Sequence, residues 1–143
     1  MGSLAAYRGG LIYLDTNVFI YAVEGVAEHA AFIDKMFLLL DAGELIATTS
    51  ELTLAEVLTK PFELSRTAVV DICQEMLVPS HWLSMVPVSR NILVEAARLR
   101  AALKIRLPDA IHLCSAAEVG CTAFVSNDRR LKMPSGLTHV LLD

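Results

Sequence analysis

Short apolar runs alternate with longer stretches of helical hydrophobic spacing along almost the whole chain. Apolar runs of four to eight residues between turn or polar residues predict strands that are buried on both faces. The predicted strands are 11–14, 45–48, one within 82–88, 121–126, and an edge strand at 138–142.

The intervening stretches predict helices over 18–24, 28–42, 50–58, 65–77, 90–104 and 108–119. Thr16 or Asn17 is expected to cap the start of the first helix. Gly43 suits the end of the second, and Pro61 is expected to end the third. Pro108 fits the first position of the last helix.

Strands that alternate with helices predict an α/β fold with a mostly parallel sheet of four or five strands. The 143 residues favour one domain over 1–143, in which residues 1–10 can form a flexible N-terminal segment. In such sheets ligands bind at the carboxyl ends of the strands, so the chemistry is expected there.

The composition narrows the class of protein. Apolar residues make up 55% of the chain, which predicts a compact domain and leaves room for a homodimer or partner interface. Three cysteines without a C-x-x-C pair argue against a disulfide framework and a structural zinc site, and favour a cytoplasmic location. No apolar run approaches the ~18 residues of a membrane span, and the start of the chain does not resemble a signal peptide.

The net charge of −4 argues against nucleic-acid binding, but the charges are unevenly distributed. Residues 1–89 carry 4 basic and 11 acidic side chains, whereas residues 90–132 carry 8 basic and 4 acidic ones. The basic segment can form a phosphate-binding face or a set of ordinary solvated helix faces, and the sequence favours neither.

Four acidic residues follow or lie near predicted strand ends, namely Asp15, Glu56, Asp109 and Asp128. Taken alone, each one is better explained by a structural role, as a helix cap, a capping box, a favourable charge at a helix start or a turn residue. Together they suit Mg²⁺ or Mn²⁺, which prefer oxygen ligands, and phosphodiester hydrolysis by one or two such ions. Bound metal is then expected to stabilise the fold as well.

The chain resembles PIN-domain nucleases in four motifs that occur in the family's order. They are LDTNV at 14–18, SELTLAEV at 50–57, LPDAIHL at 107–113 and SNDRRL at 126–131. Each motif is weak alone, but the four together extend the resemblance over roughly residues 11–142.

The resemblance implies a PIN-like three-layer sandwich and an endoribonuclease that uses Mg²⁺ or Mn²⁺ and a water nucleophile. It assigns Asp15, Glu56, Asp109 and Asp128 as catalytic metal ligands, with Asn17 and Ser126 as polar supports. In our interpretation Asp15 and Asp109 hold the main ion, Glu56 binds it or orients its water, and Asp128 completes a weaker second site. Short members of the family are often VapC toxins, which form homodimers and are neutralised by a VapB antitoxin.

Other readings stay open. Arg129 and Arg130 are candidates for contacts with RNA phosphates, and His112 can share a helix face with Asp109. The chain could instead be a housekeeping RNA-processing PIN nuclease or a non-catalytic PIN interaction module. A phosphotransfer enzyme with Asp15 as nucleophile is disfavoured, since such enzymes commonly carry aspartate where this chain has Asn17.

Overall fold

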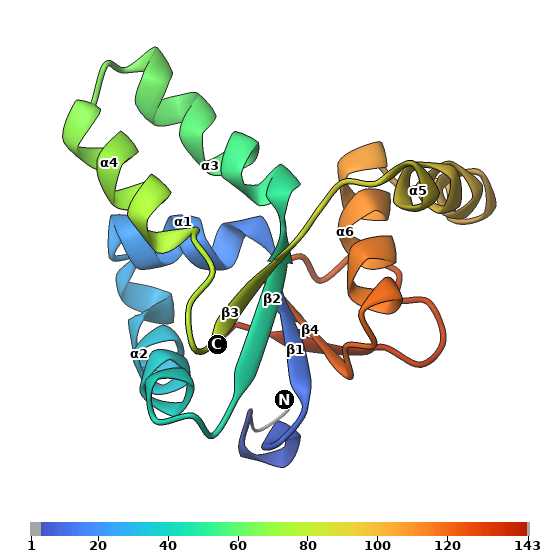
Figure 1. Ribbon diagram of the computed structural model, residues 1–143, viewed down its shortest axis with the longest axis horizontal. Helices are drawn as coiled ribbons and strands as arrows, with labels where there is room; N and C mark the ends of the chain where they lie inside the picture. Colours follow the sequence, from blue (N-terminus) through green and yellow to red (C-terminus); the bar gives the residue numbers. More distant parts are fainter. Residues whose placement is uncertain (1–3, 143) are drawn as a thin grey trace.

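A five-stranded, wholly parallel sheet forms the centre of the computed structural model, which describes residues 4–142 (Figure 1). The strand order is β3-β2-β1-β4-β5. This arrangement confirms the predicted α/β fold and the edge position of the last strand. The strands are β1 (Leu11–Leu14), β2 (Ile46–Ser50), β3 (Leu83–Val86), β4 (Ala123–Ser126) and β5 (Thr138–Leu141).

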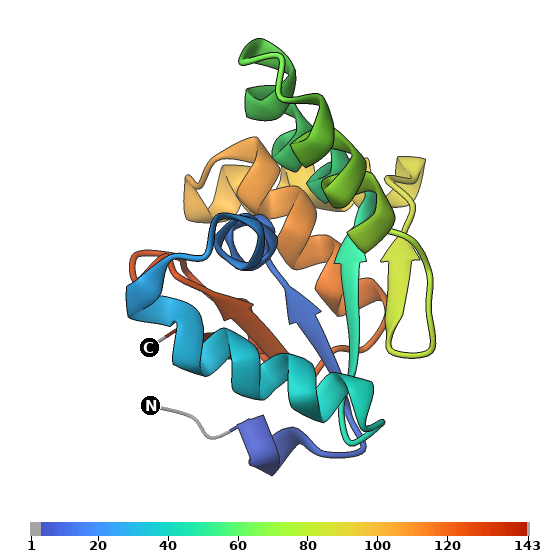
Figure 2. The same cartoon turned by 90° about the vertical axis from the view of Figure 1, so that its left-hand side faces the viewer.

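Helices cover both faces of the sheet and make a three-layer sandwich (Figure 1). One layer contains α1 (Thr16–Glu24), α2 (Ala27–Asp41), α3 (Glu51–Glu63) and α4 (Thr67–Met76), and the other contains α5 (Arg90–Leu103) and α6 (Leu107–Glu118). Figure 2 shows α3 and α4 extending beyond the carboxyl ends of the strands.

The alternation of side chains along β1 explains why the strand is apolar throughout. Ile12 and Leu14 pack into the core under α1–α4, whereas Tyr13 packs into a second core with Leu113 of α6 and Phe124 of β4. Successive strand residues point to opposite faces, so a central strand between two helical layers needs apolar side chains at every position.

The order of the strands creates a switch point between β1 and β4. The chain forms β1 first and then adds β2 and β3 on one side of it. It next passes over the second face of the sheet as α5 and α6 and adds β4 and β5 on the other side of β1. Open parallel sheets bind ligands at the carboxyl ends of the strands beside such a point. The loops after β1 and β4 are therefore the expected place for a site.

Three predictions about particular residues at helix ends are wrong. The cap of α1 is Asp15, whose side chain accepts a hydrogen bond from the Thr16 amide, and not Thr16 or Asn17. Helix α3 continues through Pro61 to Glu63, because a proline near the last turn removes only one backbone hydrogen bond. Pro108 occupies the second position of α6, which begins at Leu107.

The first described residues pack against the domain. A 3₁₀ helix spans Leu4–Tyr7, and Leu4 is buried in the core under α1–α4. Residues 1–3 of the predicted flexible segment lie outside the described residues. Within 4–142, no helix combines the length and apolarity needed to cross a bilayer.

Candidate active site

Asp15 lies at the switch point, directly after β1. Its Oδ1 accepts a hydrogen bond from the Thr16 amide at 2.9 Å, and its own amide donates to the Val125 carbonyl of β4 at 3.0 Å. The side chain is almost buried and caps the N-terminus of α1, whose dipole favours a negative charge there. The capping role and a ligand role are compatible, since the cap uses one carboxylate oxygen.

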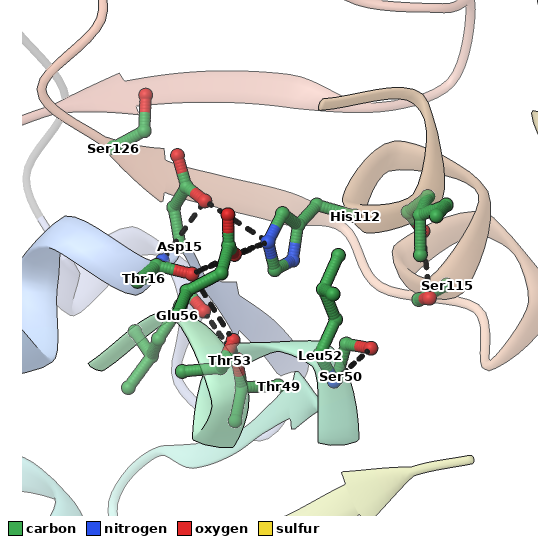
Figure 3. Close-up of polar contacts among 12 residues, drawn as sticks. Asp15, Thr16, Thr49, Ser50, Leu52, Thr53, Glu56, His112, Ser115 and Ser126 are labelled. Carbon is green, nitrogen blue, oxygen red and sulfur yellow. Dashed lines mark hydrogen bonds and ion pairs between the residues drawn. The ribbon is translucent and has the colours of Figure 1, made fainter. Parts of the chain in front are cut away.

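Glu56 reaches the same region from the second turn of α3. Its Oε1 accepts a hydrogen bond from Thr16 Oγ1 at 2.7 Å and lies 2.6 Å from His112 Nε2 (Figure 3). Both contacts use Oε1, so the hydrogen bonds within residues 4–142 leave Oε2 available. The side chain is 30% exposed, so this carboxylate is fixed on one edge and open to solvent.

Asp109 occupies the first turn of α6 and is half-buried. Burial, followed by the negative charges of Asp128 and Glu56, raises its pKa against the opposing charge of Arg106. Asp128 follows β4, and its Oδ1 accepts a hydrogen bond from the Arg130 amide at 3.0 Å. The negative charges of carboxylates from two other segments therefore act on Asp109.

The pKa of Asp15 is also raised. Burial is the largest cause, and the charges of Asp109 and Glu56 add to it, while His112 and the Thr16 amide oppose it. For Glu56, burial alone would raise the pKa, but the hydrogen bonds from His112 and Thr16 and the charge of Arg106 outweigh it and lower the pKa. The charges of Asp109 and Glu56 thus act on Asp15, and those of Asp128 and Glu56 act on Asp109.

The two predicted polar supports differ in their surroundings. Ser126 Oγ accepts a hydrogen bond from the Asp128 amide at 3.3 Å and lies 2.7 Å from His139 Nε2, so it anchors the turn that carries Asp128. The Asn17 Oδ1 is buried and has no hydrogen-bond partner among residues 4–142. The supporting role of Asn17 stays a prediction.

A buried polar network beneath the acids was not predicted. His112 is 2% exposed, and its Nδ1 lies 2.6 Å from the Tyr13 hydroxyl. Thr16 Oγ1 lies 3.3 Å from Thr53 Oγ1, which in turn lies 2.7 Å from Thr49 Oγ1. The one sequence signal was the position of His112 on the same helix face as Asp109.

Two basic side chains, Arg106 and Arg130, act on the acids. The charge of Arg106 lowers the pKa of both Glu56 and Asp109. Arg130 is 95% exposed, and its Nε lies 3.8 Å from Asp128 Oδ1. Arg129 is exposed beside it. Arg106 was part of the basic segment, but the sequence did not single it out.

A cleft of about 340 Å³ lies between α1, α3 and α4 and borders the acids through Glu56. Apolar side chains line most of it, and the charged part of the lining consists of Glu24, Glu56, Lys60 and Arg66. Three large apolar side chains of α3, α4 and their connection, Phe62, Leu64 and Ile72, are at least half exposed. The surface around the cleft therefore suits a partner that presents apolar groups.

The donor chemistry of the site fits a hard divalent cation. Among the described residues 4–142, no three His, Cys, Asp or Glu side chains are already arranged around a common metal position. The acids nevertheless supply only oxygen ligands, which a hard cation prefers, and neighbouring negative charges add to burial in raising the pKa values of Asp15 and Asp109. Asp15, Asp109, Glu56 and Asp128 are the residues that would hold it.

Comparison with known proteins decides the family. The model of the PIN domain family matches residues 12–136, which include all four acids. The chain belongs to the PIN domain family. No curated protein matches this PIN domain by sequence.

Solved structures share the fold of this PIN domain at low sequence identity. VapBC2 from Rickettsia felis, bound to a promoter DNA fragment, has a TM-score of 0.66 at 18% identity over 93% of this chain and 99% of that chain. DNA-bound VapBC from Salmonella typhimurium has a TM-score of 0.69 at 18% identity, covering 92% and 98%. VapC20 from Mycobacterium tuberculosis, described as a sarcin-ricin loop cleaving toxin, has a TM-score of 0.69 at 12% identity, covering 84% and 92%.

Proposed function

We propose that this PIN domain is a Mg²⁺- or Mn²⁺-dependent endoribonuclease. The observation that carries the proposal is the placement of carboxylates from separate segments at the carboxyl ends of the strands: Asp15 follows β1, Asp128 follows β4, and the Glu56 carboxylate is fixed on the Thr16 hydroxyl next to Asp15. A purely structural role would require no such group, since carboxylates packed together raise one another's pKa and destabilise the fold.

The residues would divide the work by position. Asp15 and Asp109 would hold the principal cation, Glu56 would bind it through Oε2 or orient a water, and Asp128 would complete a second, weaker position. The cation would supply charge stabilisation at the scissile phosphate and activation of the attacking water. Arg106, exposed beside Glu56 and Asp109, would contact an RNA phosphate on the substrate side.

We further propose that the chain is the toxin of a VapBC-type pair, works as a homodimer and is neutralised by a VapB-like antitoxin. The structural neighbours that are toxin–antitoxin complexes support a partner of this kind. The apolar cleft beside Glu56 supports it too, because an antitoxin segment seated there would block access to the acids.

The Asp109→Asn variant tests the nuclease proposal. Removing one ligand charge is expected to abolish RNA cleavage while circular dichroism and the elution volume stay unchanged. The matched control is Asp71→Asn, which removes an exposed carboxylate on α4 and should cleave at the wild-type rate. Cleavage by purified Asp109→Asn at the wild-type rate would refute the assignment.

Expression tests the toxin proposal separately. Growth arrest by the wild-type chain, absent with Asp109→Asn and relieved by the gene product of a neighbouring small reading frame, is the expected result. RNA cleavage in vitro without growth arrest would instead favour a role in RNA maturation. A chain that neither cleaves RNA nor binds Mn²⁺ would favour a non-catalytic interaction module.

A further inference from the structure

We propose that His112 is a positioning residue that holds Glu56 through an Nε2–H tautomer imposed by Tyr13. The inference rests on the proposed nuclease function, since it assigns a task to the residue that fixes one of the four acids. Its carrying observation is a continuous chain of short contacts, from the Tyr13 hydroxyl through both ring nitrogens of His112 to Glu56 Oε1.

The two ends of the imidazole have different partners. Nδ1 lies 2.6 Å from the Tyr13 hydroxyl, and Nε2 lies 2.6 Å from Glu56 Oε1. An ionised carboxylate only accepts hydrogen bonds, so Nε2 must carry a proton. In a neutral ring Nδ1 is then an acceptor, and the Tyr13 hydroxyl is the group that donates to it. The partners therefore select one tautomer of neutral His112.

Burial keeps this arrangement rigid. Tyr13 and His112 are both at most 2% exposed. The Tyr13 ring stacks on the Phe124 ring with centroids 5.0 Å apart. The His112 ring packs edge-on against the Tyr13 ring, with centroids 5.8 Å apart. Both rings are therefore held by packing between the sheet and α6.

The contact also joins the two helical layers. Glu56 comes from α3 in the layer of α1–α4, whereas His112 comes from α6 on the other face, three residues after Asp109. Helix α6 carries Asp109 itself. Through His112 it also sets the position of Glu56 (Figure 3). Thr16, next to Asp15, adds a second hydrogen bond to the same Oε1.

The hydrogen bond from His112 engages one oxygen of Glu56 and leaves the other oxygen for a ligand. His112 and Thr16 both engage Oε1, so they hold the carboxylate without using Oε2. Hydrogen bonds that orient a ligating carboxylate are worth about 10- to 100-fold in metal affinity or activity. Loss of His112 should therefore weaken the metal site without removing any ligand.

Three variants of the full chain separate positioning from packing. His112→Leu removes both hydrogen bonds, and we expect Mn²⁺ affinity by calorimetry and kcat on RNA each to fall about 10- to 100-fold. His112→Gln keeps an N–H near the Nε2 position and should restore most of both. Tyr13→Phe keeps the stacked ring but removes the donor to Nδ1, and should give an intermediate loss.

The tautomer is measured directly, and independently of activity, by ring nitrogen chemical shifts of ¹⁵N-histidine-labelled, metal-free protein. The wild type should show His112 with the proton on Nε2, and Tyr13→Phe should show a mixture of tautomers. His29→Leu is the matched control, because it removes a buried histidine that stacks on Tyr21, and its Mn²⁺ affinity should stay at the wild-type value.

The outcomes distinguish this inference from the proposed function. Wild-type affinity and kcat in His112→Leu, or an Nδ1–H tautomer in the wild type, would overturn the inference alone. A wild-type chain that neither binds Mn²⁺ nor cleaves RNA would overturn the proposed function and the role of His112 with it. If His112→Leu fails to fold, Tyr13→Phe decides, and an unchanged tautomer, affinity and kcat there would overturn the inference.

Discussion

Asp15 carries its negative charge in an environment that disfavours it. Asp15 is nearly buried and faces the charges of Asp109 and Glu56, yet it also caps α1. Because its pKa is raised on folding, the folded chain binds the proton more tightly than the unfolded chain. The free energy of unfolding therefore falls as the pH rises from the unfolded pKa to the folded pKa.

Asp15→Asn should consequently stabilise the metal-free protein at pH 7. Asparagine caps a helix about as well as aspartate, so the variant loses the unfavourable charge and keeps the cap. Each 1 kcal/mol gained raises the Tm by roughly 4 °C in a domain of this size, and the advantage should vanish below about pH 4, where the unfolded chain is also protonated. Thermal unfolding in EDTA measures it, and a lower Tm for the variant at pH 7 would contradict it.

Arg106 offers a second test at the residue scale. If its guanidinium contacts an RNA phosphate, Arg106→Gln should weaken RNA binding and reduce the slope of log K against log salt by about 1. Arg98→Gln on α5 is the control, because Arg98 is exposed and paired with Glu95. Binding is measured with Asp109→Asn as the background to prevent cleavage, and an unchanged slope in Arg106→Gln would exclude the contact.

The sequence predicted the residues at strand ends better than the residues beneath them. Asp15 and Asp128 could be placed because a strand end is visible as the limit of an apolar run. The contact between Tyr13 and His112 joins residues 99 positions apart, and both fit equally well as packed core residues. Hydrogen bonds between buried side chains of distant segments leave no periodic signal.

Among the elements, α3 differs most from its prediction. It carries Glu56 and runs on through Pro61 to Glu63, where the sequence predicted an end near Leu58. The helix begins as predicted after Ser50, whose Oγ accepts a hydrogen bond from the Leu52 amide at 3.0 Å. The start of α3 could be predicted because capping depends on neighbouring residues in the sequence. Its end could not, because the final turn depends on packing against α4.

Pro61→Ala should stabilise the protein, since it supplies the amide that is missing from the last turn of α3. A proline in a helix interior costs about 3 kcal/mol relative to alanine, and a position near the end should cost less. Urea unfolding measures the gain, and cleavage activity should be unchanged because Glu56 lies more than a turn away. A lower free energy of unfolding in the variant would show that the proline ring stabilises α3 through its packing in the cleft.

At the scale of the whole molecule, the proposed cation would add to the stability of the sandwich. A cation that binds the folded chain alone stabilises it by about 2.7 kcal/mol at a concentration 100 times the Kd. Mn²⁺ should therefore raise the Tm of the wild type and leave that of Asp109→Asn nearly unchanged. Ionic-strength-matched Na⁺ is the control, and an equal shift in both proteins would indicate a non-specific salt effect.

The layered architecture was predictable because the alternation of apolar runs and helices determines an α/β sheet. The face that each helix covers was not, since it depends on the direction of each crossover connection. The cleft between α1, α3 and α4 could not be predicted either. It forms only when α1, from the connection between β1 and β2, packs against α3 and α4, from the connection between β2 and β3.

The position of β1 between β2 and β4 has a consequence for how the protein is made. Asp15 is synthesised directly after β1, whereas β4 and the last of the four acids, Asp128, are synthesised only after β2, β3 and α6. A nascent chain therefore lacks the full set of acids until Asp128 has been added. The proposed nuclease activity would accordingly appear only after β4 has folded beside β1.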